Sequence, residues 1–214
     1  MTRRERVLAA IAHREPDRVP VDLGAMRSTG ITAVAYGRLK EYLGMSGGSI
    51  DVYDVIQQLA RPEQAVLDYV GADVVDLGRV FLTDDSDWRP FVLPDGQAAR
   101  IPAYIRFVSD GKGGRLALAS DGVPIGAMPA SSHYVDQIVF PLVDWNGDPA
   151  VLDRLPELQN HVIWAALPSP PHHLPPTPEN LIYGIIELQK RVQSGGLARH
   201  REAKTYVPIR VGTD

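Results

Sequence analysis

Two short hydrophobic segments, each flanked by helix-like sequence, constrain the fold of this 214-residue chain most strongly. Residues 18–24 and 72–78 are rich in β-branched and apolar residues and end in glycine, as short buried strands do. The spacing of apolar residues predicts helices over about 3–13, 31–43 and 62–70. Strands separated by helices in this way are typical of βα units that build a parallel sheet.

Capping and breaking residues set the expected helix ends. Thr2 and Glu5 form a T-x-x-E capping box, and Pro16 follows the first helix. Gly71 stands where the third helix should end. Residues 51–59 carry no decisive pattern, and a helix is one interpretation of them.

Turn-forming residues dominate the middle of the chain, from about residue 84 to residue 129. Clusters of Asp, Gly and Pro at 94–96, 110–114 and 121–122 separate β-rich stretches at 100–108 and 115–120. This pattern predicts antiparallel hairpins inserted between barrel-type units.

The last third of the chain has weaker signals. We expect a short helix at 148–158, a strand at 162–167 and a stiff, proline-rich stretch at 168–178. Thr177 can cap a helix that begins at Pro178. For the tail the sequence leaves two alternatives, a strand near 205–211 or disorder.

These patterns divide the chain into three regions: 1–83 as N-terminal βα units, 84–147 as a β-hairpin insertion, and 148–214 as a further αβ segment with a proline-rich linker and the tail.

Composition excludes several classes of protein. Apolar residues make up 44% and charged residues 22%, as in ordinary globular domains, which argues against disorder throughout. The net charge of −4 gives no basic surplus, so we expect no nucleic-acid partner. No run of 18 apolar residues occurs, so we expect no membrane-spanning helix and a cytoplasmic protein. The chain has no cysteine, which excludes disulfides and thiolate metal sites.

The opening segment, R-E-R-V-L-A-A-I-A-H-R-E-P-D-R-V-P-V-D at residues 4–22, resembles the start of the uroporphyrinogen decarboxylase superfamily, which includes corrinoid-dependent methyltransferases. Four further stretches resemble its methyltransferase-like branch: M-R-S-T-G at 26–30, Y-D-V-I-Q-Q-L at 53–59, G-A-D-V-V-D at 71–76 and L-P-D-G at 93–96. The resemblance covers roughly residues 3–180.

The resemblance implies a (β/α)8 (TIM) barrel, in agreement with the βα pattern. Such a barrel needs about 250 residues, and the hairpins use part of this chain. We therefore expect an α/β fold made of a partial TIM barrel with an inserted antiparallel β-hairpin subdomain. The chain would be an N-terminal portion or a truncated member of the superfamily.

Arg27 is the best single candidate for ligand binding. The decarboxylases carry a loop of the form M-R-Q-A-G-R after the first strand, and its arginines hold substrate carboxylates. Met26, Arg27 and Gly30 match that loop, whereas Ile31 replaces its second arginine. A guanidinium offers a planar fork of donors to a carboxylate. The alternative is a loop arginine that pairs with a nearby acid.

Two residues near the second predicted strand are further candidates for substrate binding. Asp76 alternates with apolar neighbours and could face the interior, although a structural hydrogen bond is the alternative. Arg79 could bind an anion or form a salt bridge at the rim. The aspartate that stabilises the substrate cation in the decarboxylases falls on Val80 here, so no catalytic residue is assigned.

The methyltransferase resemblance implies zinc bound through His-x-Cys and a later Cys, which this chain lacks. His172 and His173 are adjacent in a proline-rich setting and are poor metal ligands. We expect neither a metal nor a cofactor, with a corrinoid as substrate in the methyltransferase-like case.

Three hypotheses about function follow. The first is a uroporphyrinogen decarboxylase-like lyase, acting on a tetrapyrrole in porphyrin biosynthesis or a related activity, with a corrinoid-dependent methyltransferase-like protein as its alternative. The second is a non-catalytic binder of an anionic ligand. The third is a truncated barrel that self-associates or pairs with another chain, because open sheet edges seek partners. The sequence leaves enzymatic activity undecided.

Overall fold

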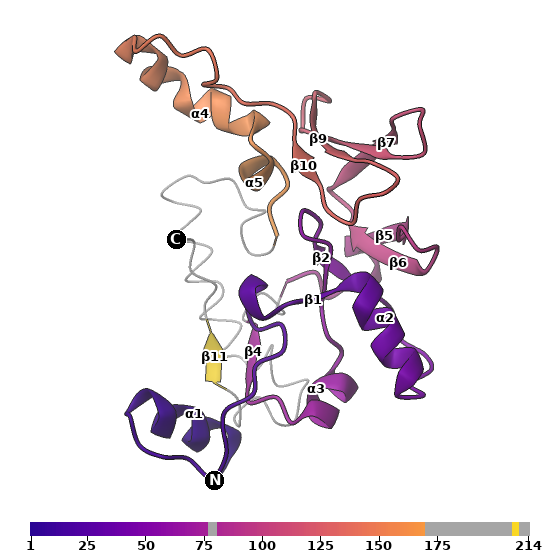
Figure 1. Cartoon of the computed structure of the whole chain (residues 1–214), viewed down its shortest axis with the longest axis vertical. Helices are drawn as coiled ribbons and strands as arrows, with labels where there is room; N and C mark the ends of the chain where they lie inside the picture. Colours follow the sequence, from indigo (N-terminus) through magenta and orange to yellow (C-terminus); the bar gives the residue numbers. More distant parts are fainter. Residues whose placement is uncertain (77–80, 170–206, 210–214) are drawn as a thin grey trace.

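The computed structural model describes residues 1–76, 81–169 and 207–209 (Figure 1). Arg79, His172, His173, most of the proline-rich stretch and the helix expected from Pro178 lie outside them.

Helices and strands both occur among the described residues. The helices are α1 (Arg3–Ile11), α2 (Ala33–Tyr42), α3 (Gln64–Val70), α4 (Leu155–Leu158) and α5 (Ile163–Ala166), and the 3-10 helices include η1 (Arg27–Thr29), η3 (Asp85–Asp87), η4 (Pro149–Arg154) and η5 (Gln159–His161). The strands are β1 (Ile31–Thr32), β2 (Val52–Asp54), β3 (Leu59–Ala60), β4 (Val74–Asp76), β5 (Trp88–Val92), β6 (Ala98–Pro102), β7 (Arg106–Ser109), β8 (Arg115–Leu118), β9 (Pro124–Met128), β10 (Asp136–Gln137) and β11 (Val207–Ile209).

The capping signals in the sequence are confirmed. The Thr2 hydroxyl accepts a hydrogen bond from the Glu5 amide, and the Glu5 carboxylate accepts one from the Thr2 amide. Gly71 ends α3 in the left-handed conformation at φ 66°, where L-residues with a side chain are strained. The three predicted helices of the N-terminal region therefore form close to their expected positions.

The described strands lie in four separate sheets. Antiparallel pairing joins β1–β3–β2, β10–β9–β8–β7 and β5–β6, whereas β4 and β11 pair in parallel. These strands do not close into a barrel. The parallel pair confirms a strand within the 205–211 tail, and the partial TIM barrel stays a prediction.

The segment at 18–24 is not a regular strand, contrary to the prediction. It runs beside β4, where the Val21 carbonyl accepts a hydrogen bond from the Asp73 amide at 2.8 Å. The Val21 amide donates instead to the Asp73 carboxylate, also at 2.8 Å. Pro20 has no amide hydrogen to offer, so a continuous ladder cannot form.

Two further assignments are corrected. Residues 51–59 form β2, a turn and the start of β3 instead of a helix. Gln58 adopts φ 53°, which a right-handed α-helix does not allow. The strand expected at 162–167 is the short helix α5. Ile163 and Leu167 are both buried in the core, and their spacing of four places them on one face of a helical turn.

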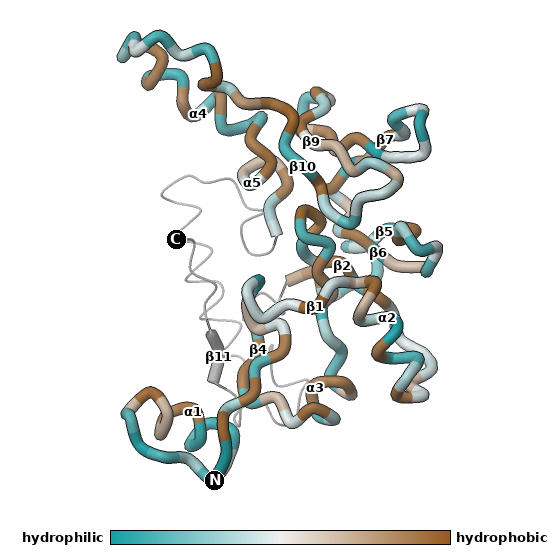
Figure 2. The backbone as a smooth tube through the Cα atoms, viewed as in Figure 1, coloured by the Kyte–Doolittle hydropathy of each residue, from teal (hydrophilic) through white to brown (hydrophobic). Residues whose placement is uncertain are grey.

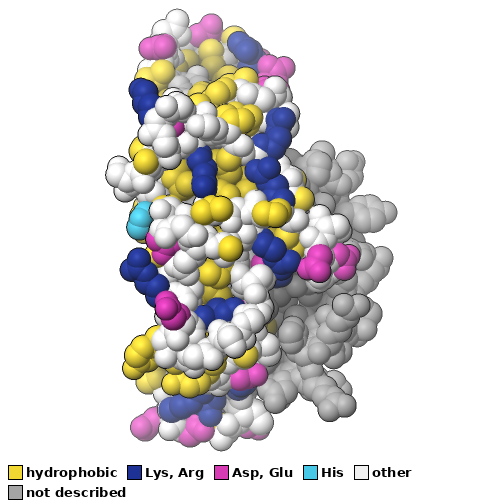
Figure 3. Space-filling model, turned by 90° about the vertical axis from the view of Figure 1, so that its right-hand side faces the viewer, with side chains coloured by type: hydrophobic (Ala, Val, Ile, Leu, Met, Phe, Trp, Pro, Cys, Tyr) yellow, Lys and Arg dark blue, Asp and Glu magenta, His cyan; other side chains and the backbone are white. Residues whose placement is uncertain are grey.

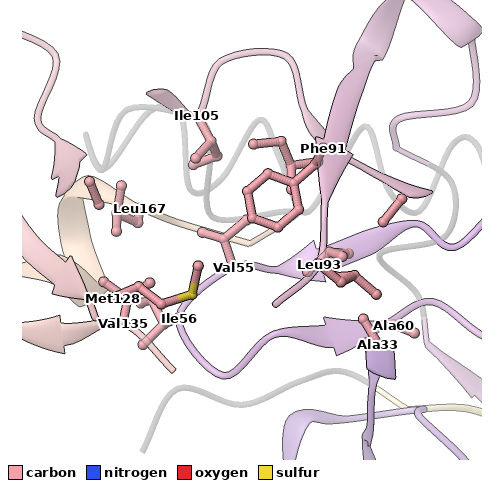
Figure 4. Packing of buried hydrophobic residues seen from close by; sticks show 14 of the residues in the cluster. Ala33, Val55, Ile56, Ala60, Phe91, Leu93, Ile105, Met128, Val135 and Leu167 are labelled. Atoms are coloured by element: carbon pink, nitrogen blue, oxygen red, sulfur yellow. The ribbon is translucent and has the colours of Figure 1, made fainter. Parts of the chain in front are cut away.

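Antiparallel hairpins form in the middle of the chain as predicted, although the stretch expected at 100–108 is divided between β6 and β7. The hairpins contribute to one shared core. Hydrophobic residues concentrate where β2, β5, β6 and the β7–β10 sheet approach one another (Figure 2). Val55, Phe91, Leu93, Met128 and Leu167 belong to this core, so it joins residues from all three regions of the chain (Figure 4).

The surface carries both signs of charge. On the face shown in Figure 3, Lys and Arg side chains are interspersed with Asp and Glu, and hydrophobic side chains are exposed between them.

A salt-bridge cluster ties the hairpin β5–β6 to the N-terminal region. The Asp51 carboxylate accepts hydrogen bonds from Arg100 at 2.8 and 3.0 Å and from Arg61 at 3.2 Å. Both guanidiniums also lie over the Trp88 ring. Desolvation acts to raise the pKa of Asp51, but hydrogen bonds from Arg100 and Ser49 and the charge of Arg61 hold that pKa below its ordinary value.

Candidate functional site

Buried polar atoms without hydrogen-bond partners occur on Arg27 and on residues 53–58, at the end of β2 and in the turn that follows it. Among the described residues, six buried side-chain nitrogen or oxygen atoms have no hydrogen-bond partner. Four of them belong to Arg27, Tyr53, Asp54 and Gln58. A buried polar atom that lacks a partner costs free energy. Arg27 Nε and Asp54 Oδ2 lie 2.6 Å apart as an ion pair, so the Tyr53 hydroxyl and the Gln58 amide oxygen are the two of these four atoms that lack a polar partner among the described residues.

Arg27 is held by contacts on three sides. It lies on η1, between the extended segment 18–22 and α2. Its Nε is 2.6 Å from a carboxylate oxygen of Asp54, in an ion pair that lacks hydrogen-bond alignment. Its Nη2 donates to the Ser169 hydroxyl at 2.5 Å, and its guanidinium carbon is 5.3 Å from the centre of the Trp164 ring.

Asp54 is the fixed acid of this site. Its residue surface is 1% exposed, at the end of β2. One carboxylate oxygen accepts hydrogen bonds from the amides of Ile56 and Gln57, at 3.1 and 2.9 Å. The turn after β2 therefore orients the carboxylate, and the other oxygen is directed to Arg27.

Tyr53 connects the second candidate, Asp76, to this site. Burial of the Tyr53 hydroxyl raises its pKa, and the nearby charges of Asp76 and Asp54 raise it further, against the opposing charge of Arg27. Tyr53 therefore stays protonated at neutral pH and can donate a hydrogen bond. The charges of Arg27 and Asp76, two of the predicted residues, therefore both influence this hydroxyl, in opposite directions.

Two partly exposed aromatic rings border the site. Trp164, beneath the Arg27 guanidinium, is 46% exposed, and Tyr104 is 40% exposed. The Tyr104 hydroxyl donates to the Pro168 carbonyl at 2.8 Å, one residue before the Ser169 that binds Arg27. A cation therefore lies beside an exposed apolar surface.

The predicted site residues have different outcomes. Arg27 forms an ion pair with Asp54, and its binding of a ligand stays a prediction. Asp76 is buried at the end of β4. Arg79 lies outside the described residues, so its role stays a prediction.

Sequence reasoning missed Tyr53, Asp54, Trp164 and Ser169 as site residues. The Y-D-V-I-Q-Q-L segment gave a signal for the first two, because it resembles the superfamily. Ser169 is 142 residues from Arg27, and nothing local in the sequence indicates that they meet.

The most specific part of the opening motif has a structural role. Asp73, which is fully buried, accepts hydrogen bonds from Arg6 at 2.5 Å and from Arg18 at 2.8 and 3.1 Å. Arg6 also donates to both carboxylate oxygens of Asp17, at 2.6 and 2.8 Å. The H-R-E-P-D-R segment thus fastens α1 to β4.

The described part of the chain holds no group of three or more His, Cys, Asp or Glu placed to bind a metal ion. None of its helices combines the length and hydrophobicity needed to cross a bilayer.

Comparison with protein-family models, curated proteins and solved structures found no match. The superfamily resemblance therefore rests on the sequence segments quoted above.

Proposed function

We propose that this chain is a uroporphyrinogen decarboxylase-superfamily protein that binds a tetrapyrrole through one of its peripheral carboxylates at Arg27. The observation that carries the proposal is the Arg27 guanidinium, fixed by Asp54 and lying over the partly exposed ring of Trp164. The opening motif and the M-R-S-T-G loop support it independently.

The chemistry of the site suits such a ligand. A tetrapyrrole has a flat apolar ring system with carboxylates at its edge. A ligand carboxylate would replace the Ser169 hydroxyl on Nη2 of Arg27 and gain a charge-assisted hydrogen bond. The rings of Trp164 and Tyr104 offer apolar surface to the macrocycle, and the Tyr53 hydroxyl is a further donor.

The reaction itself has no assigned catalytic group. The position of the decarboxylase aspartate falls on Val80, which lies outside the described residues. A non-catalytic binder of the same anionic ligand would use the same contacts. A corrinoid is the alternative ligand, but its amide side chains are weaker partners for a guanidinium than carboxylates are.

A panel of ligands tests this proposal. The full chain is titrated with uroporphyrin and, separately, with methylcobalamin, and binding is followed by absorbance. Turnover of uroporphyrinogen is followed by chromatography of the products after oxidation. Saturable binding of uroporphyrin supports the proposal, and turnover separates a lyase from a binder. Binding of methylcobalamin alone would favour the methyltransferase-like alternative, and binding of neither ligand would refute the tetrapyrrole site.

A further inference from the structure

Two arginines outside the Arg27 site each carry a buried nitrogen atom without a hydrogen-bond partner. They are Arg89 on β5 and Arg115 on β8, and the buried atoms are Nε of Arg89 and Nη1 of Arg115. Neither guanidinium forms a hydrogen bond or an ion pair with another described residue. Charged groups that are withdrawn from water are ordinarily paired, so these two cations lack the anionic partner that such positions require.

Phe91 links the two arginines. The guanidinium carbon of Arg115 lies 4.3 Å from the centre of the Phe91 ring. Arg89 stands two residues before Phe91 on β5, so both side chains project from one face of the strand, about 7 Å apart along it. The ladder with β6 is unbroken here, with Arg89 opposite Ile101 and Phe91 opposite Ala99. Both guanidiniums can therefore reach one small ligand.

Packing between two sheets fixes this arrangement. Arg115 lies on β8, which is hydrogen-bonded to β7 on one side and to β9 on the other. The ring of Phe107 on β7 is 5.6 Å from the ring of Phe91 on β5, centre to centre. Figure 1 shows the β5–β6 hairpin next to the strands β7 and β9. The two arginines thus project from strands that pack together, and no flexible loop carries them.

The surroundings of Arg115 are short of negative charge. Burial lowers the pKa of its guanidinium, and no carboxylate among the described residues offsets that effect. The acid closest to it in sequence, Asp110 in the turn between β7 and β8, is engaged: its Oδ1 accepts hydrogen bonds from the amides of Lys112 and Gly114. An anion beside Arg115 would therefore supply the interaction that the protein itself leaves out.

We propose that Arg89 and Arg115 form a second anion-binding site, separate from Arg27, which takes the dianionic phosphoryl group of inorganic phosphate or of a small phosphate monoester. Two guanidiniums match the two negative charges, and their forked N–H donors can bond to several phosphoryl oxygens at once. A carboxylate has one charge and two oxygens, so it pairs fully with only one arginine. Both arginines are partly exposed, so such a ligand can reach them from solvent.

Isothermal titration calorimetry of the full chain tests the proposal, with inorganic phosphate, glycerol phosphate and acetate as separate ligands at constant ionic strength. One phosphate per chain should bind saturably, and acetate should bind at least about tenfold more weakly. Binding of inorganic phosphate alone identifies the free ion as the ligand, whereas binding of both phosphates shows that a monoester is accepted; either result supports the site.

Variants place the ligand. Arg89→Gln and Arg115→Gln should each weaken phosphate binding by at least about tenfold, because each removes charge-assisted hydrogen bonds. Arg115→Lys keeps the charge over Phe91 but loses the fork of donors, so it should also weaken binding. Arg38→Gln is the matched control, since Arg38 is well exposed and pairs only loosely with Asp95; it should stay within about twofold of wild type.

Several results would overturn the proposal. They are the absence of saturable phosphate binding, equal affinities for acetate and phosphate, and phosphate affinity that survives both glutamine variants. Two phosphates per chain, with each variant removing one of them, would show that the arginines do not share a ligand. Loss of phosphate binding in Arg27→Ala alone would place the anion at the first site instead. Circular dichroism of each variant confirms that it is folded.

Discussion

Replacing Asp73 with alanine should destabilise the fold strongly without touching the Arg27 site. Asp73 accepts four hydrogen bonds: one from Arg6, two from Arg18 and one from the Val21 amide. Its side chain is fully buried. Its removal leaves three donor groups to find other partners at once.

The loss of stability depends on which of these donors can form other hydrogen bonds once Asp73 is removed. Arg18 is 41% exposed and can turn to water, whereas Arg6 is nearly buried but keeps Asp17. Breaking a buried ion pair by removing one partner costs about 3–5 kcal/mol. Because Asp17 compensates part of the charge, we expect the lower end, about 3 kcal/mol. In a chain of this length that loss lowers the melting temperature by about 6–12 °C.

Urea unfolding followed by circular dichroism measures this change. Asp73→Ala should lower the midpoint with an unchanged slope, and Asp73→Asn should have a smaller effect because its amide oxygen still accepts hydrogen bonds. Glu157→Ala is the control, because Glu157 and its partner Arg154 are both well exposed; it should cost less than about 1 kcal/mol. If Asp73→Ala costs no more than Glu157→Ala, the motif does not fasten α1 to β4.

Three further predictions follow from particular contacts. The fold lowers the pKa of Asp51, so the ionised carboxylate stabilises the folded state fully above the unfolded-state pKa of about 3.9. This stabilisation is lost as the pH falls through the folded-state pKa. Asp51→Asn should therefore make the unfolding free energy decline less steeply on the acid side. Gly71→Ala should cost about 1–2 kcal/mol in thermal unfolding, because φ is 66° there, and an effect near zero would contradict this. Tyr53→Phe removes a buried hydroxyl that has no hydrogen-bond partner among the described residues. The free energy of unfolding should therefore stay within about 1 kcal/mol of wild type, while uroporphyrin binding weakens. A large loss of stability would show that the hydroxyl makes a structural hydrogen bond.

Local sequence signals were sufficient to predict those helices and hairpins whose ends are marked by capping or turn residues. The capping box at Thr2, the left-handed Gly71 and the Asp- and Gly-rich hairpin turns predicted α1, α3 and the β-hairpins. The segments at 18–24 and 162–167 were misassigned because tertiary partners decide them. At 18–24, the Val21 amide donates to the Asp73 side chain instead of to a backbone carbonyl of a neighbouring strand. At 162–167, the burial of Ile163 and Leu167, four positions apart, favours a helical turn.

The candidate site was only partly predictable for a related reason. Arg27 carried a local motif and a recognisable chemistry. The acid that orients it, Asp54, is the last residue of a strand in a segment that the sequence left ambiguous. Trp164 and Ser169 contact Arg27 from more than 130 residues further along the chain. Contacts over such distances in sequence depend on the packing of the shared core, which periodicity and turn residues do not reveal.

The most direct test of the Arg27 site compares uroporphyrin affinity among three proteins by isothermal titration calorimetry: wild type, Arg27→Ala and Arg38→Ala. Arg38 is a well-exposed arginine that pairs only loosely with Asp95, so it controls for the loss of one positive charge. Loss of a hydrogen bond to a charged group costs about 1.5–3 kcal/mol, so Arg27→Ala should weaken binding by roughly 10- to 150-fold. Arg38→Ala should leave it within about twofold of wild type. Equal affinities for wild type and Arg27→Ala would contradict a carboxylate-binding site at Arg27.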